Sequence, residues 1–292
     1  MSNSMPRIAV LLAAYNGMTF IKVQLDSILK QKGVLISVFI SVDKSTDDTF
    51  AWCEAISKSD DRVSVLPYGE RFGGAGPNFF RLIRDVDFIN FDLVALSDQD
   101  DIWLEDKLIT AHDVMKKNNV AAYSSNVMAF WDGGEQAIIE KAQPQRKYDY
   151  LFEAAGPGCT YVLASMPLQE FKENLLKKKS LANKITLHDW LIYAFFRAND
   201  YGWYIDKNYK MLYRQHQSNQ VGVNKGKAAA IRRFELFKSG WYRQQVESVS
   251  QFVDDERPNF SSKYQLLKNI VQLRRKFSDR VALFFFVLFG IY

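Results

Sequence analysis

Three carboxylates stand within four residues at Asp98, Asp100 and Asp101, directly after the apolar run 93–96. Carboxylates this close repel one another, and a bound divalent cation removes the repulsion. Carboxylate oxygens suit hard ions such as Mg²⁺ or Mn²⁺, which complete their coordination with phosphate oxygens and water. The cluster therefore predicts a metal site whose natural companion is a nucleoside diphosphate. The alternative is a solvated acidic turn that caps the next helix.

The elements around this cluster predict a sheet that would position it. Apolar runs at 8–13, 34–42, 62–66 and 93–96 are typical of buried strands, and helical patterns at 21–29, at 49–57 and after the Gly-rich loop 73–77 separate them. Strands that alternate with helices indicate parallel βαβ units. Ligands of such sheets bind outside the carboxyl ends of the strands, where the polar turns 15–16, 43–48 and 98–101 lie.

The pattern becomes mixed after a helical segment at 104–117. Strands are predicted at 120–126, 160–164 and 209–214, a helix at 188–197, and a linker at 221–226. We therefore predict two parts, an α/β domain over 1–224 and a basic helical extension over 225–292.

Composition and charge narrow the class of protein. The chain has 292 residues, of which 48% are hydrophobic and 24% charged, which is globular and excludes a disordered or fibrous protein. Its two cysteines, Cys53 and Cys159, are far apart, so we expect neither a disulfide framework nor a cysteine zinc site, and a reducing cytoplasm is the default. No signal peptide is expected at the amino terminus.

Positive charge is concentrated at the carboxyl end. Residues 1–224 carry a net charge of −2, whereas residues 225–292 carry +7. The apolar run 281–292 follows Arg274, Arg275, Lys276 and Arg280. As a helix this run would measure about 18 Å, which is too short to span a bilayer. A basic segment beside an aromatic-rich one suits an anionic membrane surface. The alternative is a helical pair that packs on the catalytic domain or on a second copy of the chain.

Four segments, in this order, resemble family 2 glycosyltransferases of the GT-A fold. The segment Ser97–Trp103 is similar to the DxD motif of that family, in the form frequent in bacterial rhamnosyltransferase-like members. Upstream, 13–17 resembles the first-strand motif, 43–49 the DxSxDxT segment, and 71–78 the loop before the third helix. The resemblance covers about residues 6–220 and implies a Rossmann-like mixed sheet that binds a nucleotide sugar.

The resemblance also implies the residues that bind the donor. Ala13, Tyr15 and Asn16 would line the nucleotide pocket, and Asp98 would face the ribose. Asp43 would accept the pyrimidine imide N–H, unless it caps a helix. Gly74 belongs to the donor loop, and Arg71 either touches the diphosphate or is a surface arginine. The metal, Mg²⁺ or Mn²⁺, would be held by Asp100 and by His216, for which a structural hydrogen bond is the alternative.

Asp189 is similar to the second acidic motif of the family, whose carboxylate acts as the base. The reaction needs one, because an acceptor hydroxyl must lose its proton as it attacks the anomeric carbon. A plain helix cap is the alternative role, and His188 is the rival base. Gly158 resembles a loop near donor sugar and acceptor, and Trp190 is either an aromatic platform for the acceptor or a core residue.

The sequence thus predicts a metal-dependent, inverting glycosyltransferase of bacterial surface polysaccharide synthesis. The expected donor is dTDP-rhamnose, and the expected acceptor is a lipid-linked glycan or an oligosaccharide. The expected location is the cytoplasm, peripheral on the inner face of the cell membrane, with a possible homodimer through 225–292. We expect no nucleic-acid partner. The alternatives are a sugar nucleotidyltransferase and a non-enzymatic basic module that binds membrane or nucleic acid.

Overall fold

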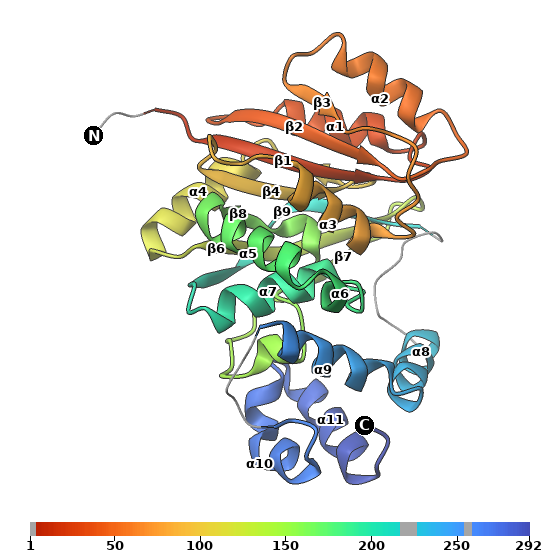
Figure 1. Ribbon diagram of the computed structural model, residues 1–292, viewed down its shortest axis with the longest axis vertical. Coiled ribbons are helices and arrows are strands. Elements are labelled where there is room, and N and C mark those ends of the chain that lie inside the picture. The colour runs from red at the N-terminus through yellow and green to blue at the C-terminus, as the bar shows by residue number, and fades with distance from the viewer. Residues whose placement is uncertain (1–3, 217–226, 254–258) are drawn as a thin grey trace.

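A single mixed sheet organises the amino-terminal two thirds of the chain (Figure 1). The computed structural model describes residues 4–216, 227–253 and 259–292. The strand order is β3-β2-β1-β4-β8-β6-β9-β5, with β7 paired to β6. The first four strands in this order are parallel, as predicted, and they are β1 (Arg7–Ala14), β2 (Leu35–Val42), β3 (Val63–Val65) and β4 (Leu93–Asp98).

The alternation of side chains along β1 explains why helices cover both faces of the sheet. Ala9, Leu11 and Ala13 belong to one hydrophobic core, and Ile8, Val10, Leu12 and Ala14 belong to the other. Because both faces of β1 are buried, its sequence is a continuous apolar run. The helices of this half are α1 (Ile21–Leu29), α2 (Thr49–Ser57), α3 (Ala75–Asp85) and α4 (Lys107–Asn118).

The second half of the sheet departs from the parallel pattern. β8 (Val162–Ala164) pairs antiparallel with β4 and with β6 (Ala122–Trp131), whereas β9 (Trp203–Gln215) runs parallel to β6. The remaining elements of this half are β5 (Ile102–Trp103), β7 (Gln136–Ile139), the 3₁₀ turns Asp149–Leu151 and Gly158–Thr160, α5 (Ser165–Lys177), α6 (Lys179–Ala182) and α7 (His188–Ala198).

Several predicted elements differ in extent from those observed. β4 continues to Asp98, α4 begins only at Lys107, and the predicted strand 160–164 begins as a 3₁₀ turn. β6 and β9 are longer than predicted because they pair with each other through polar and aromatic stretches, with a register shift near Asn126. Three further elements, β7, α5 and α6, were not predicted from the sequence. The predicted linker 221–226 and the predicted domain boundary at 224 lie outside the described residues.

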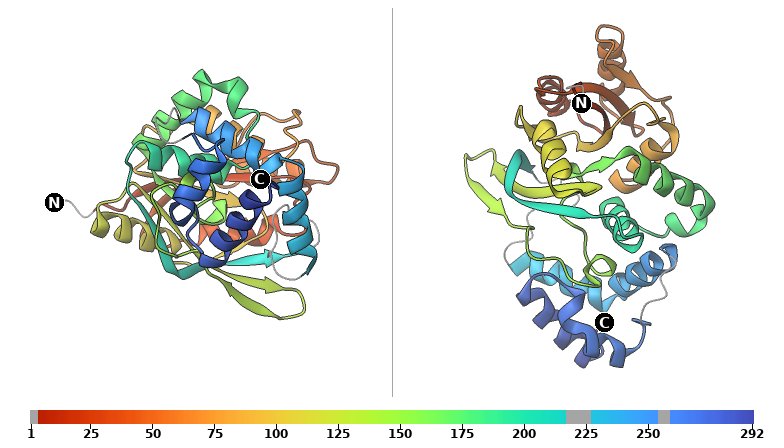
Figure 2. Two further views of the ribbon diagram at one scale, coloured as in Figure 1. Left: turned by 90° about the horizontal axis from the view of Figure 1, so that it is seen from below. Right: turned by 90° about the vertical axis from the view of Figure 1, so that its left-hand side faces the viewer.

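The carboxyl-terminal extension consists of helices, as predicted. These are α8 (Lys227–Lys238), α9 (Trp241–Phe252), α10 (Lys263–Leu273) and α11 (Phe277–Leu288). They gather at the end of the molecule opposite α2 and β3 (Figures 1 and 2). Leu266, Leu273 and Leu283 belong to the same core as α3 and α7, so the extension packs on the α/β domain.

Two arginines of the extension do not lie where the sequence predicted them. Arg274 and Arg275 were expected to face lipid headgroups, but both point into the molecule and bind carboxylates and carbonyls of residues 149–155. The burial of Arg275 is possible because Asp149 and Glu153 compensate its charge, and Arg274, which is 20% exposed, pairs with Asp279. Among the described residues, no helix is both long and apolar enough to cross a membrane.

Candidate active site

The turns that follow β1, β2 and β4 are bound to one another. The side-chain amide of Gln99 accepts a hydrogen bond from Tyr15 N and donates one to Tyr15 O, each at 2.8 Å. This pairing brings Asp98 beside Ala13 across the ladder of β1 and β4. A Cβ on Gly17 would lie 2.3 Å from the Gln99 Oε1 atom, so a larger residue there would have to displace the Gln99 side chain that joins the two turns. The predicted meeting of the polar turns is confirmed.

A second set of bonds joins the β1 turn to the β2 turn. The side-chain oxygen of Asn16 accepts from Thr46 N at 2.8 Å, and Ser45 Oγ accepts from Asn16 N at 3.0 Å. Asn16 has a φ of 44°, a left-handed conformation that asparagine tolerates better than most residues. Asn16 therefore shapes the predicted nucleotide pocket through its backbone, while the Tyr15 side chain is exposed beside it.

Asp43 is occupied by the backbone of the Gly-rich loop. Its carboxylate accepts hydrogen bonds from Phe72 N at 2.8 Å, Gly73 N at 2.9 Å and Lys44 N at 2.7 Å. Gly73, with a φ of 82°, supplies the left-handed turn that leads into α3. Asp43 does not cap α2, where Asp47 accepts from Thr49 N instead. Asp43 thus holds the loop that contains Gly74, and contact with a base stays a prediction.

Two residues of α3 that were not predicted as site residues bind the end of β2 beside Asp43. The Asn78 side chain is buried, is hydrogen-bonded to the Ser41 hydroxyl, and donates to Ser41 O at 3.1 Å. Arg81 donates to Ser41 Oγ at 2.9 Å and to Pro67 O at 2.6 Å. A charged residue in the middle of an otherwise apolar helix face was the available signal for Arg81.

Two aspartates of the acidic turn lie close to a buried cysteine. Ligand atoms of Asp98, Asp101 and Cys159 lie within 4.8 Å of one another. Burial, followed by the charges of Asp100 and Asp189, raises the pKa of Asp98 to about 7. Burial raises the pKa of Asp101 well above its usual range, and its Oδ2 atom has no hydrogen-bond partner among the described residues. Burial also raises the pKa of the Cys159 thiol, so the thiol stays protonated.

Lys107 supplies positive charge beneath this group. Its side chain is completely buried, donates to Cys159 O at 3.1 Å, and lies 3.4 Å from the centre of the Trp103 ring. Burial lowers its pKa to about 7, whereas Asp101 acts in the opposite direction. Lys107 is the first residue of α4, where the helix dipole disfavours a cation. The sequence signal for the role of Lys107 is a lysine at the start of a helix, directly after an acidic run.

Asp100 and His216 meet, although 116 residues separate them. The His216 Nε2 atom lies 2.7 Å from Asp100 Oδ2, and the imidazole lies 4.8 Å from the Phe20 ring. Arg214 fixes the approach of the two strands, because its backbone N–H donates to Asp101 Oδ1 and its Nε donates to Asp100 O. The structure therefore brings together both residues that were predicted to hold a metal.

The donor atoms of this corner fit a divalent cation. The buried Asp101 Oδ2 atom has no hydrogen-bond partner among the described residues, so the carboxylates of this corner are only partly compensated. Carboxylates prefer Mg²⁺ or Mn²⁺, and an added imidazole favours Mn²⁺ over Mg²⁺. The protonated Cys159 thiol suits neither ion. Asp100 and His216, whose ligand atoms lie 2.7 Å apart, are therefore the residues of this corner that would hold such an ion.

Asp189 stands in the first turn of α7, next to the loop that leads to the acids. A Cβ on Gly158 would lie 3.2 Å from the Asp189 Cβ atom and 2.4 Å from His188 Nε2, so the loop approaches α7 as closely as glycine allows. Burial raises the pKa of Asp189 to about 6, and the Trp190 N–H bond of 2.8 Å and the charge of Lys141 act against this rise. Asp189 does not occupy the N-cap position, which belongs to Leu187.

The rival base, His188, is unsuited to proton abstraction. Its ring is buried against Phe79, with 4.1 Å between the ring centres, and burial lowers its pKa to about 3. Trp190 is also a core residue. It is 2% exposed, stacks on Tyr242 of α9 and donates to Tyr150 O at 2.9 Å, so the prediction of an acceptor platform is wrong. Arg71 is exposed at the edge of the donor loop.

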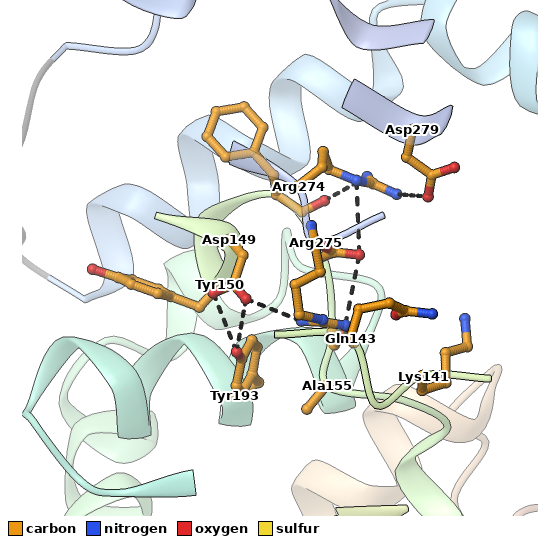
Figure 3. A network of polar contacts seen from close by, with 12 residues as sticks. Lys141, Gln143, Asp149, Tyr150, Ala155, Tyr193, Arg274, Arg275 and Asp279 are labelled. Carbon is orange, nitrogen blue, oxygen red and sulfur yellow. Dashed lines mark hydrogen bonds and ion pairs between the residues drawn. The ribbon is translucent and has the colours of Figure 1, made fainter. Parts of the chain in front are cut away.

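A buried polar network holds α7 to the segment around Asp149 and to the extension (Figure 3). Asp149 accepts from Tyr193, one turn after Asp189, and from Arg197 at 3.2 Å. Arg275 of the extension lies 3.4 Å from Asp149 and donates to Ala154 O at 2.6 Å. The carboxyl-terminal extension is therefore tied to the helix and to the loop that position Asp189.

Comparisons with known proteins agree with this geometry. Residues 9–175 match the model of glycosyl transferase family 2. The chain is 44% identical to the dTDP-rhamnosyl transferase RfbG of Shigella flexneri, over 96% of this chain and 100% of that protein. It is 26% identical to the UDP-Glc:alpha-D-GlcNAc-diphosphoundecaprenol beta-1,3-glucosyltransferase WfgD of Escherichia coli, over 55% of this chain and 61% of that one.

The fold is similar to that of S. aureus TarS 1-349, solved in complex with UDP. The TM-score is 0.58 at 12% identity, over 90% of this chain and 70% of that one, which supports the likeness of fold alone. The predicted GT-A fold, with its mixed sheet and carboxyl-terminal helices, is confirmed. The family match and the near full-length relative together place this chain in glycosyl transferase family 2.

Proposed function

We propose that the enzyme transfers rhamnose from dTDP-rhamnose to a lipid-linked glycan or an oligosaccharide during synthesis of a bacterial surface polysaccharide. The donor is supported by the name of the 44% identical relative, a dTDP-rhamnosyl transferase. The lipid-linked acceptor is supported by the diphosphoundecaprenol in the name of a second relative. Such an acceptor agrees with the predicted cytoplasmic location on the inner face of the membrane. Membership of the family decides against a nucleotidyltransferase and a non-enzymatic basic module.

One observation carries the proposed mechanism. Gly158 and Cys159, which are adjacent in the chain, stand between the proposed base and the acidic turn. Asp189 lies against Gly158, and the acids Asp98 and Asp101 lie against Cys159. A donor whose diphosphate lies at the acidic turn would therefore have its sugar next to Asp189. The turns after β1, β2 and β4 are braced together before the donor arrives, which spares the ordering cost on binding.

The reaction proposed is a single displacement with inversion. Asp189 takes the proton of an acceptor hydroxyl while the acceptor oxygen forms a bond to the anomeric carbon. The bond between that carbon and the diphosphate oxygen breaks, and dTDP leaves with the electron pair through an oxocarbenium-like state. A divalent cation held by Asp100 and His216 would neutralise charge on the departing diphosphate. The raised pKa of Asp189 makes it a stronger base than an ordinary carboxylate.

The pKa of Asp189 predicts the acid limb of the pH profile. A base with a pKa of about 6 is ionised above that value and becomes protonated as the pH falls through it. We expect kcat/KM to be level above about pH 7 and to fall roughly tenfold per pH unit below about pH 6. The measurement is kcat/KM at saturating metal between pH 5 and pH 8. An acid limb near pH 4 would contradict this role of the carboxyl.

Asp100 predicts a link between metal and nucleotide. Asp100→Ala removes a ligand from the set that also includes His216, so we expect dTDP to lose most of the affinity that Mn²⁺ confers. Calorimetric titration of dTDP with and without Mn²⁺ measures this. Asp106→Asn, an exposed acid paired with Lys210 on the surface, is the matched control and should bind like wild type. Equal Mn²⁺ dependence in both variants would remove Asp100 from the metal site.

A further inference from the structure

One side of α11 is apolar and exposed. Phe277, Val281, Phe284, Phe285, Leu288 and Phe289 recur at helical spacing, and each is exposed by more than a third. Phe277 and Phe289, at the two ends of this row, are 72% and 69% exposed. We call these six residues the α11 face. Leu283 and Val287, on the opposite side of the helix, are buried and attach α11 to the rest of the protein.

The rim of the α11 face is cationic. Lys276 is exposed directly before Phe277, the guanidinium of Arg280 lies 5.5 Å from the Phe277 ring, and Lys263 donates to Leu288 O at 2.8 Å. Residues 263–292 contain one acid, Asp279, and its carboxylate is bound by Arg274 at 3.1 Å. On α10 and α11, the one acid near these cations is therefore Asp279, and its carboxylate is already paired with Arg274.

From this arrangement we propose that the α11 face docks on the surface of an anionic lipid bilayer. Phenyl rings enter the interfacial region, while Lys263, Lys276 and Arg280 bind lipid phosphates. A second copy of the chain fits this face less well, because pairing two α11 faces would bring their cationic rims together, and Asp279, the acid of α10 and α11, is already paired with Arg274. The buried Arg274 and Arg275 take no part in the docking.

The position of the α11 face suits an enzyme that works at a membrane. α10 and α11 lie at the end of the molecule opposite α2 and β3 (Figure 1), so docking of the α11 face would place the bilayer at the end that the extension forms. The inference rests on the proposed function in one respect, since a lipid-linked acceptor would bring the enzyme to a bilayer. The experiment below contains no sugar donor or acceptor, so its failure is distinguishable from a failure of the proposed transfer.

The test is co-sedimentation of the full chain with vesicles of phosphatidylcholine, with or without one third phosphatidylglycerol. We expect the wild-type protein to bind the anionic vesicles, to bind less as salt rises, and to bind neutral vesicles weakly. Phe285→Glu/Phe289→Glu should bind the anionic vesicles roughly tenfold more weakly. Both side chains are exposed, so the double variant should melt at the wild-type temperature. Ile89→Glu, an exposed apolar residue outside the extension, is the matched control and should bind like wild type.

Lys276→Glu tests the charge separately and should weaken binding to anionic vesicles alone. The inference is overturned if the wild-type protein stays in the supernatant, or if the double variant sediments as the wild type does. It is also overturned if light scattering after gel filtration shows a wild-type dimer that the double variant dissociates, because the α11 face would then be an interface between two copies of this chain.

Discussion

Asp189→Asn is expected to lower kcat by roughly 10²- to 10⁴-fold while leaving dTDP affinity unchanged. The amide has the shape of the carboxylate and its oxygen can still accept the Trp190 N–H bond, so α7 should keep its first turn. An amide cannot take a proton from an acceptor hydroxyl, and His188 cannot replace it because burial holds the imidazole neutral against Phe79. Initial rates of sugar transfer and calorimetric titration with dTDP measure the two quantities.

The matched control for Asp189→Asn is Asp113→Asn, an exposed acid on α4 that lies beside His112. It should transfer sugar at the wild-type rate. The acid limb of the pH profile should also disappear from the residual activity of Asp189→Asn. Turnover within a few-fold of wild type would show that another group takes the proton, and the assignment of the base would be abandoned.

Arg275→Met is expected to lower the free energy of unfolding by about 3 kcal/mol, because it leaves buried carboxylates without a partner cation. Asp149 is completely buried, Glu153 is 14% exposed, and Arg275 contacts both. Burial already raises the pKa of Asp149, against the charges of Arg275 and Arg197. The melting temperature should fall by roughly 5–10 °C. Differential scanning calorimetry gives the value.

Arg275→Met should also reduce catalysis more than donor binding. Arg275 donates to Ala154 O, four residues before Gly158, and the network continues through Tyr193 to the helix that carries Asp189. A shift of this loop would move the base, whereas the donor turns belong to distant strands, so kcat should fall by roughly tenfold or more at unchanged dTDP affinity. Lys276→Met, the exposed neighbour, is the control. A calorimetric scan of Arg275→Met that matches this control would refute the role of the network.

The local pattern of the sequence predicted the first half of the sheet closely. The strands of that half are buried on both faces and therefore appear as apolar runs, and the polar turn 43–48 directly precedes α2, so the start of this helix depends on neighbouring residues alone. β6 and β9 were predicted too short, because a pairing between distant strands stabilises them and no local pattern records it. The choice between platform and core stayed open for Trp190 for a related reason, since Tyr242, which covers it, lies 52 residues away.

The sequence by itself indicated the family of this protein, glycosyl transferase family 2, because acids at strand ends and the DxD-like segment are features of neighbouring residues. Only the tertiary structure decided which side chains face one another. His216 meets Asp100 across 116 residues, and Arg275 meets Asp149 across 126. A basic segment such as 274–276 has the same local pattern whether it faces water or a buried carboxylate. Burial of an arginine depends on a compensating charge that the fold alone brings within reach.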